Sequence, residues 1–291
     1  MAPPTPSVVV YPAVRLLRPG NTLVSFAGTV VGALAARGGG LAWDPAFALA
    51  AILAAISTAC VTAAGNVVND ILDRETDRVN HPDRPLVTGS VRVPTARRLA
   101  VGLFLVAAVA IAPLSFAHPL LPVILAAAVG TLLAYEFRFK AHGVSGNSLV
   151  AFLTAAVFLY GGAVTSHLVV VLPFAAMAFG ATLSREVIKD MEDAEGDVGR
   201  RTLPRIHGMA LATQVARFAV AGAVLLSPLP LATFFSVSSA AGIMYLGLVL
   251  AADALFVVSV AYLPRRLHWE QTLSKGAMTI ALLAFLAAAF R

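Results

Sequence analysis

The amino-acid sequence predicts an all-α fold, a polytopic membrane bundle of about nine transmembrane helices with its N-terminus in the cytoplasm. Composition is the first observation: 59% of the 291 residues are hydrophobic, only 12% are charged, and the mean hydropathy is +0.85. A soluble domain would carry about 25% charged residues. The second observation is that apolar runs long enough to cross a bilayer recur along the whole chain. The third is that basic residues lie almost entirely on one side of these runs.

Nine apolar stretches qualify as spans, because a crossing needs ~20 mostly apolar residues. In chain order they cover 20–36, 46–70, 97–116, 119–136, 147–164, 168–190, 209–227, 238–262 and 271–290. Residues 228–263 are long for one crossing, so eight spans with a re-entrant or interfacial piece are the alternative. Pro113 and Pro173 lie within spans and predict kinks there.

The recurrence of spans predicts one integral membrane domain with no separate soluble module. A parallel pseudo-repeat is predicted within it, because Arg18-Pro-Gly-Asn21 precedes the first span and Gly143-Val-Ser-Gly-Asn147 precedes the fifth. The domain covers 1–291, its two repeats cover 1–140 and 141–263, and the final helix covers 271–290.

The basic residues orient the bundle in the cell membrane. A cytoplasmic N-terminus places all of the 21 Lys and Arg residues except Arg37 and Arg291 on the cytoplasmic side. This is the distribution that the positive-inside rule predicts. No cleaved signal peptide is expected, because the first 20 residues lack an apolar h-region and a small-residue cleavage site.

Two acidic stretches follow the second and sixth spans, and both face the cytoplasm in this orientation. The spacing i, i+3/4, i+7, i+11 predicts that the polar residues of each stretch share one helical face. In the first stretch these residues are Asn66, Asn69, Asp70, Asp73, Asp77 and Asn80, and in the second they are Glu186, Asp190, Asp193 and Asp197. Polar residues at membrane depth usually mark a functional site.

The residue types indicate the chemistry of that site. Carboxylates and an Asn carbonyl, without Cys or clustered His, are the hard oxygen ligands of Mg²⁺ or Mn²⁺. Two Mg²⁺ on facing helices would bridge one diphosphate, and interleaved cations would bind its remaining oxygens. These cations are Arg74, Arg84, Lys140, Lys189 and Arg201. The alternative is two solvated helix ends with pairs such as Asp70/Arg74, but matched spacing on the same side favours a site.

These motifs resemble those of a known family. Asn69-Asp-Ile-Leu-Asp73-Arg-Glu-Thr-Asp77, followed by Asn80-His-Pro-Asp-Arg84-Pro85, looks like the first aspartate-rich motif of the UbiA superfamily of membrane prenyltransferases. Asp193-Ala-Glu-Gly-Asp197 matches the second motif. Residues 185–204 look most like the archaeal members that make membrane lipids by prenylating geranylgeranylglyceryl phosphate.

The resemblance implies a central cavity beneath a cytoplasmic cap formed by the loops after the second and sixth spans. It also implies a role for each motif residue. The metal ligands would be Asn69, Asp73, Glu186, Asp193 and Asp197. The substrate-binding residues would be Arg18, Asn21, Arg84, Tyr135, Lys140, Lys189 and Arg201, and the catalytic residues would be Asp77 and Asp190.

The implied reaction is transfer of an isoprenoid chain from an allylic diphosphate, with two Mg²⁺ as cofactor. The allylic cation formed when the diphosphate leaves must be kept from water, and aromatic faces can stabilise it. Candidate aromatic residues in spans three, five and six are Phe104, Phe152, Phe158, Tyr160, Phe174 and Phe179. The expected partners are a prenyl diphosphate donor, a lipid or aromatic acceptor and the bilayer, with no nucleic acid.

Alternative functions remain at this stage. The acceptor in the same superfamily could be 4-hydroxybenzoate, a quinone precursor, haem or chlorophyllide. A cation-coupled transporter would also place acidic residues among repeated helices, but nearer the bilayer midplane. A CDP-alcohol phosphotransferase is excluded, because its acidic motif within one helix pair is missing. Asp253 lies mid-span, where a charge is costly, and predicts a cavity or helix-pairing role.

Overall fold

The computed structural model describes residues 12–39, 44–165, 167–194 and 201–291, and all of its regular structure in these ranges is helical. The long helices are α2 (Pro19–Arg37), α3 (Pro45–Leu72), α5 (Val93–Ile111), α6 (Leu120–Ala134), α7 (Gly143–Ala163), α8 (Leu168–Glu192), α9 (Leu203–Leu226), α11 (Ala240–Ala261) and α12 (Leu267–Leu286). Two short helices, α4 (Arg74–Asn80) and α10 (Leu229–Thr233), a helical segment at 12–16, and the short turns Ala112–Leu114, Tyr135–Phe139 and Ala287–Phe290 complete the described regular structure.

The prediction of nine spans is confirmed for the described part of the chain, where nine helices are long and apolar enough to cross a membrane. The stretch 228–263, for which a re-entrant piece was the alternative, divides in two. Its first part, α10, extends the span that begins at Leu203, and the span Ala240–Ala261 follows after a turn. The seventh span was predicted to start at 209. Helix α9 begins earlier, at Leu203, but it is interrupted at Gly208, whose φ of 84° and ψ of 163° are not helical.

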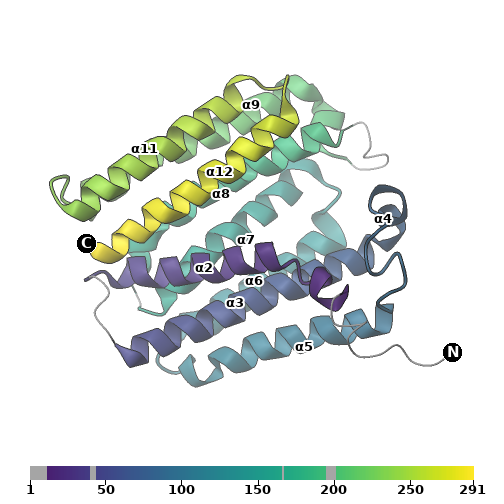
Figure 1. The fold of residues 1–291 in the computed structure, drawn as a ribbon, viewed down its shortest axis with the longest axis horizontal. Coiled ribbons are helices and arrows are strands. Elements are labelled where there is room, and N and C mark those ends of the chain that lie inside the picture. The colour runs from purple at the N-terminus through teal and green to yellow at the C-terminus, as the bar shows by residue number, and fades with distance from the viewer. Residues whose placement is uncertain (1–11, 40–43, 166, 195–200) are drawn as a thin grey trace.

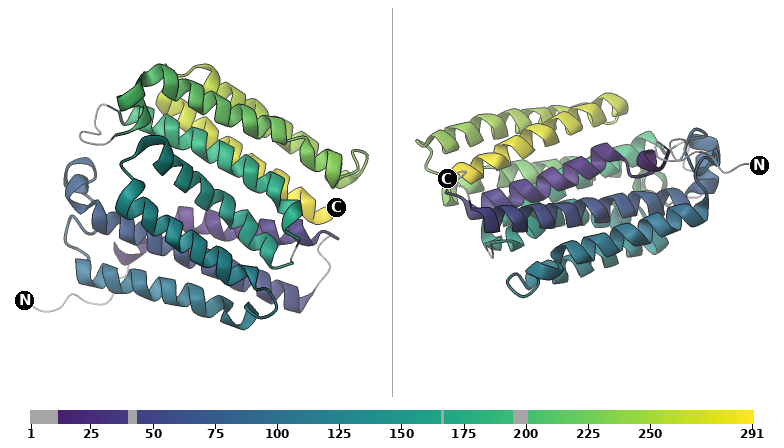
Figure 2. Two further views of the ribbon diagram at one scale, coloured as in Figure 1. Left: turned by 180° about the vertical axis from the view of Figure 1, so that it is seen from behind. Right: turned by 60° about the horizontal axis from the view of Figure 1, so that its bottom comes forward.

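The helices run roughly parallel to the long axis of the molecule (Figure 1). In that view α2, α3 and α5 lie on the lower side of the bundle and α9, α11 and α12 on the upper side. When the molecule is seen from behind, α6 and α7 lie nearest the viewer (Figure 2, left). Neighbouring pairs include α7 with α8, α3 with α5, α8 with α9, α11 with α12, and α2 with both α3 and α7. The helix ends that carry the two acidic stretches lie at the same end of the bundle.

Helices α2 and α7 cross with their backbones in close contact. A Cβ atom added at Gly161 would lie 2.2 Å from the carbonyl oxygen of Thr29, and one added at Gly32 would lie 2.7 Å from that of Phe158. Only glycine at both positions permits this approach, which is how membrane helices gain packing contacts without a hydrophobic driving force between them.

Local sequence explains where several helices begin and end. Asp44 caps α3 by accepting hydrogen bonds from the backbone N–H groups of Ala46 and Phe47, both at 3.1 Å. The predicted kink at Pro113 is wrong, because α5 ends at Ile111 and the proline lies in the turn that follows. Proline lacks the N–H that would continue the helix. Pro173, in contrast, lies inside a continuous α8.

Candidate active site

Each acidic stretch runs across the C-terminal end of a long helix. Asp73 is the C-cap of α3 with φ −84° and ψ 1°, and Asp193 is the C-cap of α8 with φ −84° and ψ −1°. The backbone N–H of each bonds the carbonyl four residues earlier, at 2.9 Å in both cases. A carboxylate at a helix C-terminus faces the negative end of the helix dipole, an unfavourable interaction of about 0.3–1 kcal/mol that a nearby cation offsets. The two helix ends therefore create matching cation-attracting positions.

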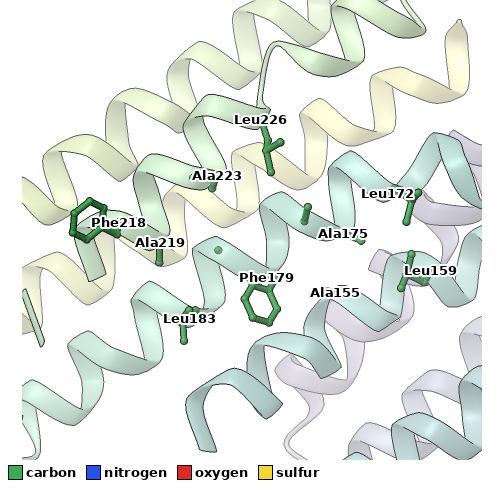
Figure 3. A pocket seen from close by; sticks show the side chains of 13 residues that line it. Ala155, Leu159, Leu172, Ala175, Phe179, Leu183, Phe218, Ala219, Ala223 and Leu226 are labelled. Carbon is green, nitrogen blue, oxygen red and sulfur yellow. The ribbon is translucent and has the colours of Figure 1, made fainter. Parts of the chain in front are cut away.

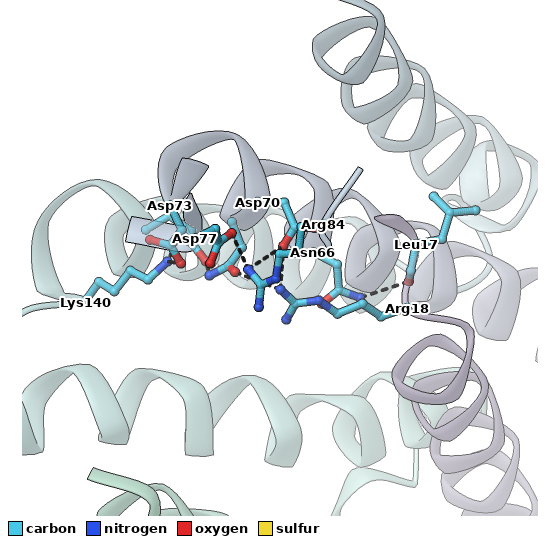
Figure 4. A network of polar contacts seen from close by, with 10 residues as sticks. Leu17, Arg18, Asn66, Asp70, Asp73, Asp77, Arg84 and Lys140 are labelled. Carbon is cyan, nitrogen blue, oxygen red and sulfur yellow. Dashed lines mark hydrogen bonds and ion pairs between the residues drawn. The ribbon is translucent and has the colours of Figure 1, made fainter. Parts of the chain in front are cut away.

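The first acidic stretch keeps its shared face across the interruption at Asp73. Asp70 and Asp77 are both buried, each only 4% exposed. The Arg84 guanidinium donates from Nη1 to both of them, at 3.2 Å to Asp70 and 2.5 Å to Asp77 (Figure 4). Asp77 therefore holds Arg84 in place through one of its carboxylate oxygens.

Arg18 ties the start of α2 to the same network. Its Nη2 donates to Asp70 at 2.5 Å and to the side-chain oxygen of Asn69 at 3.1 Å (Figure 4). Arg18 has φ 47° and ψ 71°, the one positive φ of a non-glycine residue among those described. Such a conformation costs of order 1–3 kcal/mol and persists where the surroundings impose it, often at functional sites.

The loop that carries Arg84 also makes a contact on the exposed surface of the protein. Arg15 donates to Asp83 at 2.6 Å, and this hydrogen bond lowers the pKa of the exposed Asp83 carboxyl below its usual value. Arg74, another cation expected to bind phosphate, donates from Nε to the backbone oxygen of Leu86 at 3.1 Å.

A second cluster joins α3 to the end of α6, and it contains a residue that the sequence analysis missed. Lys140 donates to Asp73 at 2.7 Å and to Glu136 at 3.0 Å. Glu136 also accepts from the amide nitrogen of Asn69 at 3.0 Å, and its side chain is only 4% exposed. A carboxylate four residues before Lys140, at the end of an apolar run, was the available sequence signal.

The backbone of the α6 end explains this geometry. Residues Tyr135–Phe139 form a π-helical turn, closed by a hydrogen bond from the Lys140 N–H to the Tyr135 carbonyl at 2.8 Å. Such wide turns occur frequently at functional sites. Here the turn places Glu136 and Lys140 together beside the end of α3.

The second acidic stretch pairs differently. Asn147, near the start of α7, donates to Asp190 at 2.7 Å. Glu186 lies 2.9 Å from the Arg185 guanidinium and 3.6 Å from the Lys189 ammonium. At the end of α8, Glu192 accepts hydrogen bonds from His268, at 3.1 Å, and from Gln271 of α12.

A central cavity of about 880 Å³ lies among the helices. Its polar wall contains Arg18, Asn21, Asn66, Asn69, Tyr135, Glu136, Arg185, Glu186, Lys189, Asp253 and Lys275. The rest of the wall is largely apolar and comes from α2, α3, α6, α7, α8, α11 and α12. The expected central cavity is thus present, with polar groups gathered on part of its wall.

The predicted aromatic lining is only partly correct. Phe158 and Tyr160 line the cavity, whereas Phe174 is completely buried in the core against Phe285 and Tyr245. Phe104 and Phe152 are not among the cavity-lining residues. Which face of a helix meets the cavity depends on packing, which periodicity within an all-apolar helix does not reveal.

A separate groove of about 500 Å³ lies between α7, α8 and α9. Phe179 lines this groove together with Leu159, Leu183 and Phe218 (Figure 3). No charged side chain lines it, so it offers nothing to bind a diphosphate. The central cavity is the candidate active site.

Most of the predicted site residues either line the cavity or lie in the polar networks beside it. Arg18, Asn21, Asn69, Tyr135, Glu186 and Lys189 line the cavity. Asp73, Asp77, Arg84, Lys140 and Asp190 lie in the polar networks beside it. Arg201 is placed next to the link between α6 and α7 by its backbone N–H, which donates to the carbonyl of Ala141 at 3.0 Å. Asp193 is the C-cap of α8, and Asp197 lies outside the described residues.

The donor chemistry fits a divalent cation. Within the described ranges, no three His, Cys, Asp or Glu side chains are grouped closely enough to hold a metal ion. Even so, Asp73 and Glu136 converge on one ammonium group, and Asp73 caps a helix with no basic residue in its last turn. Hard oxygen donors that converge on a positive charge at a negative helix end are suited to Mg²⁺.

Asp253 lines the cavity and also pairs two helices, so both roles expected for it are present. It accepts a hydrogen bond from the Ser227 hydroxyl at 2.6 Å, and Tyr245 donates to the Ser227 carbonyl at 2.7 Å. This contact joins α11 to the end of α9.

Comparison with known proteins agrees with this architecture. The model of the UbiA prenyltransferase family matches residues 25–288. The chain is 42% identical over 221 residues to the digeranylgeranylglyceryl phosphate synthase of Natronomonas pharaonis, covering 75% of this chain and 76% of the relative.

Two solved structures have the same fold. One comes from work on digeranylgeranylglyceryl phosphate synthase in membranes; it is 30% identical with a TM-score of 0.78, covering 97% of this chain and 98% of the other. The other is a UbiA homologue from Archaeoglobus fulgidus bound to GPP and Mg²⁺; it is 18% identical with a TM-score of 0.70, covering 96% of this chain and 98% of the other. With its multi-pass bundle, paired acidic stretches and central cavity, the chain belongs to the UbiA prenyltransferase family and is a membrane prenyltransferase.

Proposed function

We propose that this prenyltransferase moves a geranylgeranyl chain from geranylgeranyl diphosphate to the hydroxyl of geranylgeranylglyceryl phosphate, in a Mg²⁺-dependent step of archaeal membrane lipid synthesis. The observation that carries the proposal is the central cavity of about 880 Å³, which joins a polar wall of cations and carboxylates to a largely apolar wall suited to an isoprenoid chain. Relatives named for this activity, and a homologue bound to GPP and Mg²⁺, support it.

The two helix ends would hold the metal ions. Asp73 with Asn69 would bind on the α3 side, and Asp193 with Asp197 and Glu186 on the α8 side. Mg²⁺, when bound, neutralises the charge that gathers on a leaving diphosphate. Mn²⁺ has the same ligand preference and is the alternative ion.

The chain's own cations would hold the donor diphosphate. Arg84 is kept in place by Asp70 and Asp77, and Lys140 by Asp73 and Glu136. Each cation thus keeps a fixed position while its remaining N–H groups bind phosphate oxygens. A positioned donor beside a developing negative charge contributes more than a mobile one, because it needs no reorganisation during the reaction.

The apolar wall would protect the allylic cation. Loss of the diphosphate leaves a delocalised carbocation that water would capture. Phe158 and Tyr160 of α7 line the cavity, and Tyr160 is held by a hydrogen bond between its hydroxyl and that of Ser57 at 3.1 Å. Their ring faces can stabilise a nearby positive charge.

The acceptor hydroxyl forms the new C–O bond and loses its proton to a base. Asp77, predicted to be catalytic, is buried and bonded to Arg84, so we assign it to positioning Arg84 instead. On α8, Asp190 is held by Asn147, and Glu186 lines the cavity. These two carboxylates are the candidates for the proton acceptor.

The decisive assay combines purified protein, Mg²⁺, labelled geranylgeranyl diphosphate and a panel of acceptors. Product is expected with geranylgeranylglyceryl phosphate and should disappear when EDTA removes the metal. Prenylation of 4-hydroxybenzoate without reaction of the phosphorylated lipid would overturn the proposed acceptor while leaving family membership intact.

A further inference from the structure

Lys275 lies on α12, outside both acidic motifs, and lines the central cavity. It falls within the predicted span 271–290, where a charge at membrane depth needs an explanation. The described residues give its ammonium group no ion pair and no side-chain hydrogen bond. Other charged residues of the cavity wall do have partners: Arg18 pairs with Asp70, and Glu136 with Lys140.

Helix α12 brings Lys275 alongside the cations of α8. The two helices meet where Glu192, the last residue of α8, bonds His268 and Gln271. Lys275 follows Gln271 by one helical turn, while Lys189 and Arg185 precede Glu192 by about one and two turns, and each turn advances ~5.4 Å. All three cations line the same cavity.

The charge balance of this group is positive. Arg185 and Lys189 share the single carboxylate of Glu186, at 2.9 Å and 3.6 Å. Lys275 adds a third cation, and the side chain of Lys189 is half exposed. Among the described residues, Glu186 is the carboxylate ion-paired within this group, while the neighbouring Asp190 accepts from Asn147 and Asp253, on the same cavity wall, accepts from Ser227. A phosphate monoester carries about −1.5 to −2 charges at neutral pH, so these three cations would attract it.

The same face of α12 continues into an apolar stripe. Met278, Leu282 and Phe285 follow Lys275 at intervals of three and four residues, and all of them line the cavity. This spacing places them along one side of the helix. One helix face thus offers a cation followed by an apolar track, the pattern of a lipid with an anionic head group.

We infer that Lys275, with Arg185 and Lys189, forms the site for the phosphate head of the acceptor lipid, and that Met278, Leu282 and Phe285 line the path of its chain. The site is separate from the Arg84 and Lys140 positions assigned to the donor diphosphate. This inference rests on the proposed function, because only a phosphorylated acceptor needs such a site. An uncharged aromatic acceptor would bring no negative charge to Lys275, for which the described residues provide no ion pair.

The test compares Lys275→Met and Lys275→Arg with wild type, using geranylgeranylglyceryl phosphate and the same lipid without its phosphate. Lys275→Met should raise KM for the phosphorylated lipid about 10-fold or more, since a charge-assisted contact is lost. Its KM for the donor and its kcat at saturating acceptor should change by less than about 2-fold, the pattern of lost ground-state binding. Lys275→Arg should restore most of the affinity.

Two further measurements complete the test. Arg97→Met removes an exposed cation of α5 that does not line the cavity, and it should leave both KM values unchanged. Binding of the phosphorylated lipid, measured by calorimetry without donor or Mg²⁺, should weaken in Lys275→Met and in Lys189→Met but not in Arg97→Met.

The outcomes separate the two proposals. If wild type uses the phosphorylated lipid but Lys275→Met leaves its KM and binding unchanged, or raises the donor KM instead, the head-group site is wrong and the function stands. If wild type neither binds nor prenylates the phosphorylated lipid, the proposed function is wrong and the head-group site fails with it.

Discussion

Glu136 holds two predicted site residues at once, because it accepts from the Asn69 amide and from the Lys140 ammonium. The first contact turns the Asn69 oxygen away from Glu136, where it accepts from Arg18. The second gives Lys140 a partner other than Asp73. When a metal ion takes Asp73, Lys140 can therefore stay in place, so Glu136 acts as a positioning residue for both ends of the cluster.

Neutralising Glu136 tests this role. In Glu136→Gln the Lys140 charge would be balanced by Asp73 alone and would compete with the metal there. We expect the Mg²⁺ concentration for half-maximal activity to rise about 10-fold, since a charge-assisted contact is worth about 1.5–3 kcal/mol. The Mg²⁺-dependent increase in Tm should shrink in parallel. Glu75→Gln is the control, because Glu75 pairs with Arg78 on the exposed surface at 2.7 Å; an equal effect there would contradict the assignment.

The two helix-terminal carboxylates make a stronger prediction. Asp73→Ala and Asp193→Ala should each lower kcat by about 10²-fold or more, because charge stabilisation at the leaving group is lost. Asp73→Asn should be nearly as harmful, since the negative charge is needed as well as the shape. Asp83→Asn, in the exposed loop, should stay near wild type. Normal turnover of either alanine variant at limiting Mg²⁺ would remove that residue from the metal site.

At the scale of the elements, the α2–α7 crossing fixes the positions of two helices that both line the cavity. Gly28 of α2 and Val157 and Phe158 of α7 line the cavity close to the point of contact. The contact has no room for a Cβ atom on Gly161, because the obstructing atom is a backbone oxygen that cannot rotate away. Packing at this crossing therefore sets the shape of the cavity.

Gly161→Ala should consequently destabilise the protein by about 1–3 kcal/mol, the usual cost of overpacking, and lower its Tm. Gly102→Ala on α5 is the matched control, since a Cβ atom there meets nothing within 4 Å. The control should be neutral or gain up to ~1 kcal/mol from the better helix propensity of alanine. Equal Tm values for the two variants in the same detergent would show that the crossing is not tight.

For the whole molecule, the described contacts connect the two acidic stretches through the link between α6 and α7. Lys140 reaches back to Asp73, and Ala141 next to it accepts a hydrogen bond from the Arg201 N–H. Asn147, six residues further, bonds Asp190. This link therefore brings the ends of α3 and α8 to one end of the bundle, which we propose is the cytoplasmic end.

Single-cysteine labelling in a Cys60→Ser background tests that orientation. Ser90→Cys and Met209→Cys should react with a membrane-impermeant maleimide only when the cytoplasmic side is open. Ser238→Cys, in the turn before α11, should react from the other side. Labelling of Ser90→Cys and Met209→Cys from opposite sides would rule out a shared active site, since two metal ions that act on one diphosphate lie within about 4 Å of each other.

Asp73 and Asp193 have matching backbone angles, but these angles are common at helix ends, so the pseudo-repeat stays a prediction. The partners of the equivalent carboxylates differ, however. Asp70 pairs with Arg18 and Arg84, whereas Asp190 bonds Asn147. The two acidic stretches therefore have different surroundings. We propose that the cations beside α3 bind the donor diphosphate and that those of α8 bind the acceptor.

The sequence by itself determined the number of spans and the residues of the two acidic motifs. These features are local: an apolar run can be recognised within about 20 residues, and the spacing of Asp70, Asp73 and Asp77 can be recognised within about two helical turns. Basic residues on one side also predict an orientation, through a rule that requires no knowledge of helix contacts.

Only the tertiary structure decided which side chains meet. Lys140 and Asp73 are 67 positions apart in the chain, and Lys275 joins Arg185 and Lys189 only because α12 packs beside α8. An apolar helix in a membrane gives no periodic signal for its cavity-facing side, since both lipid and cavity accept apolar residues. For this reason Phe174 and Phe179 were assigned to the cavity wrongly, while Glu136 and Lys275 were recognised only after the helices were placed.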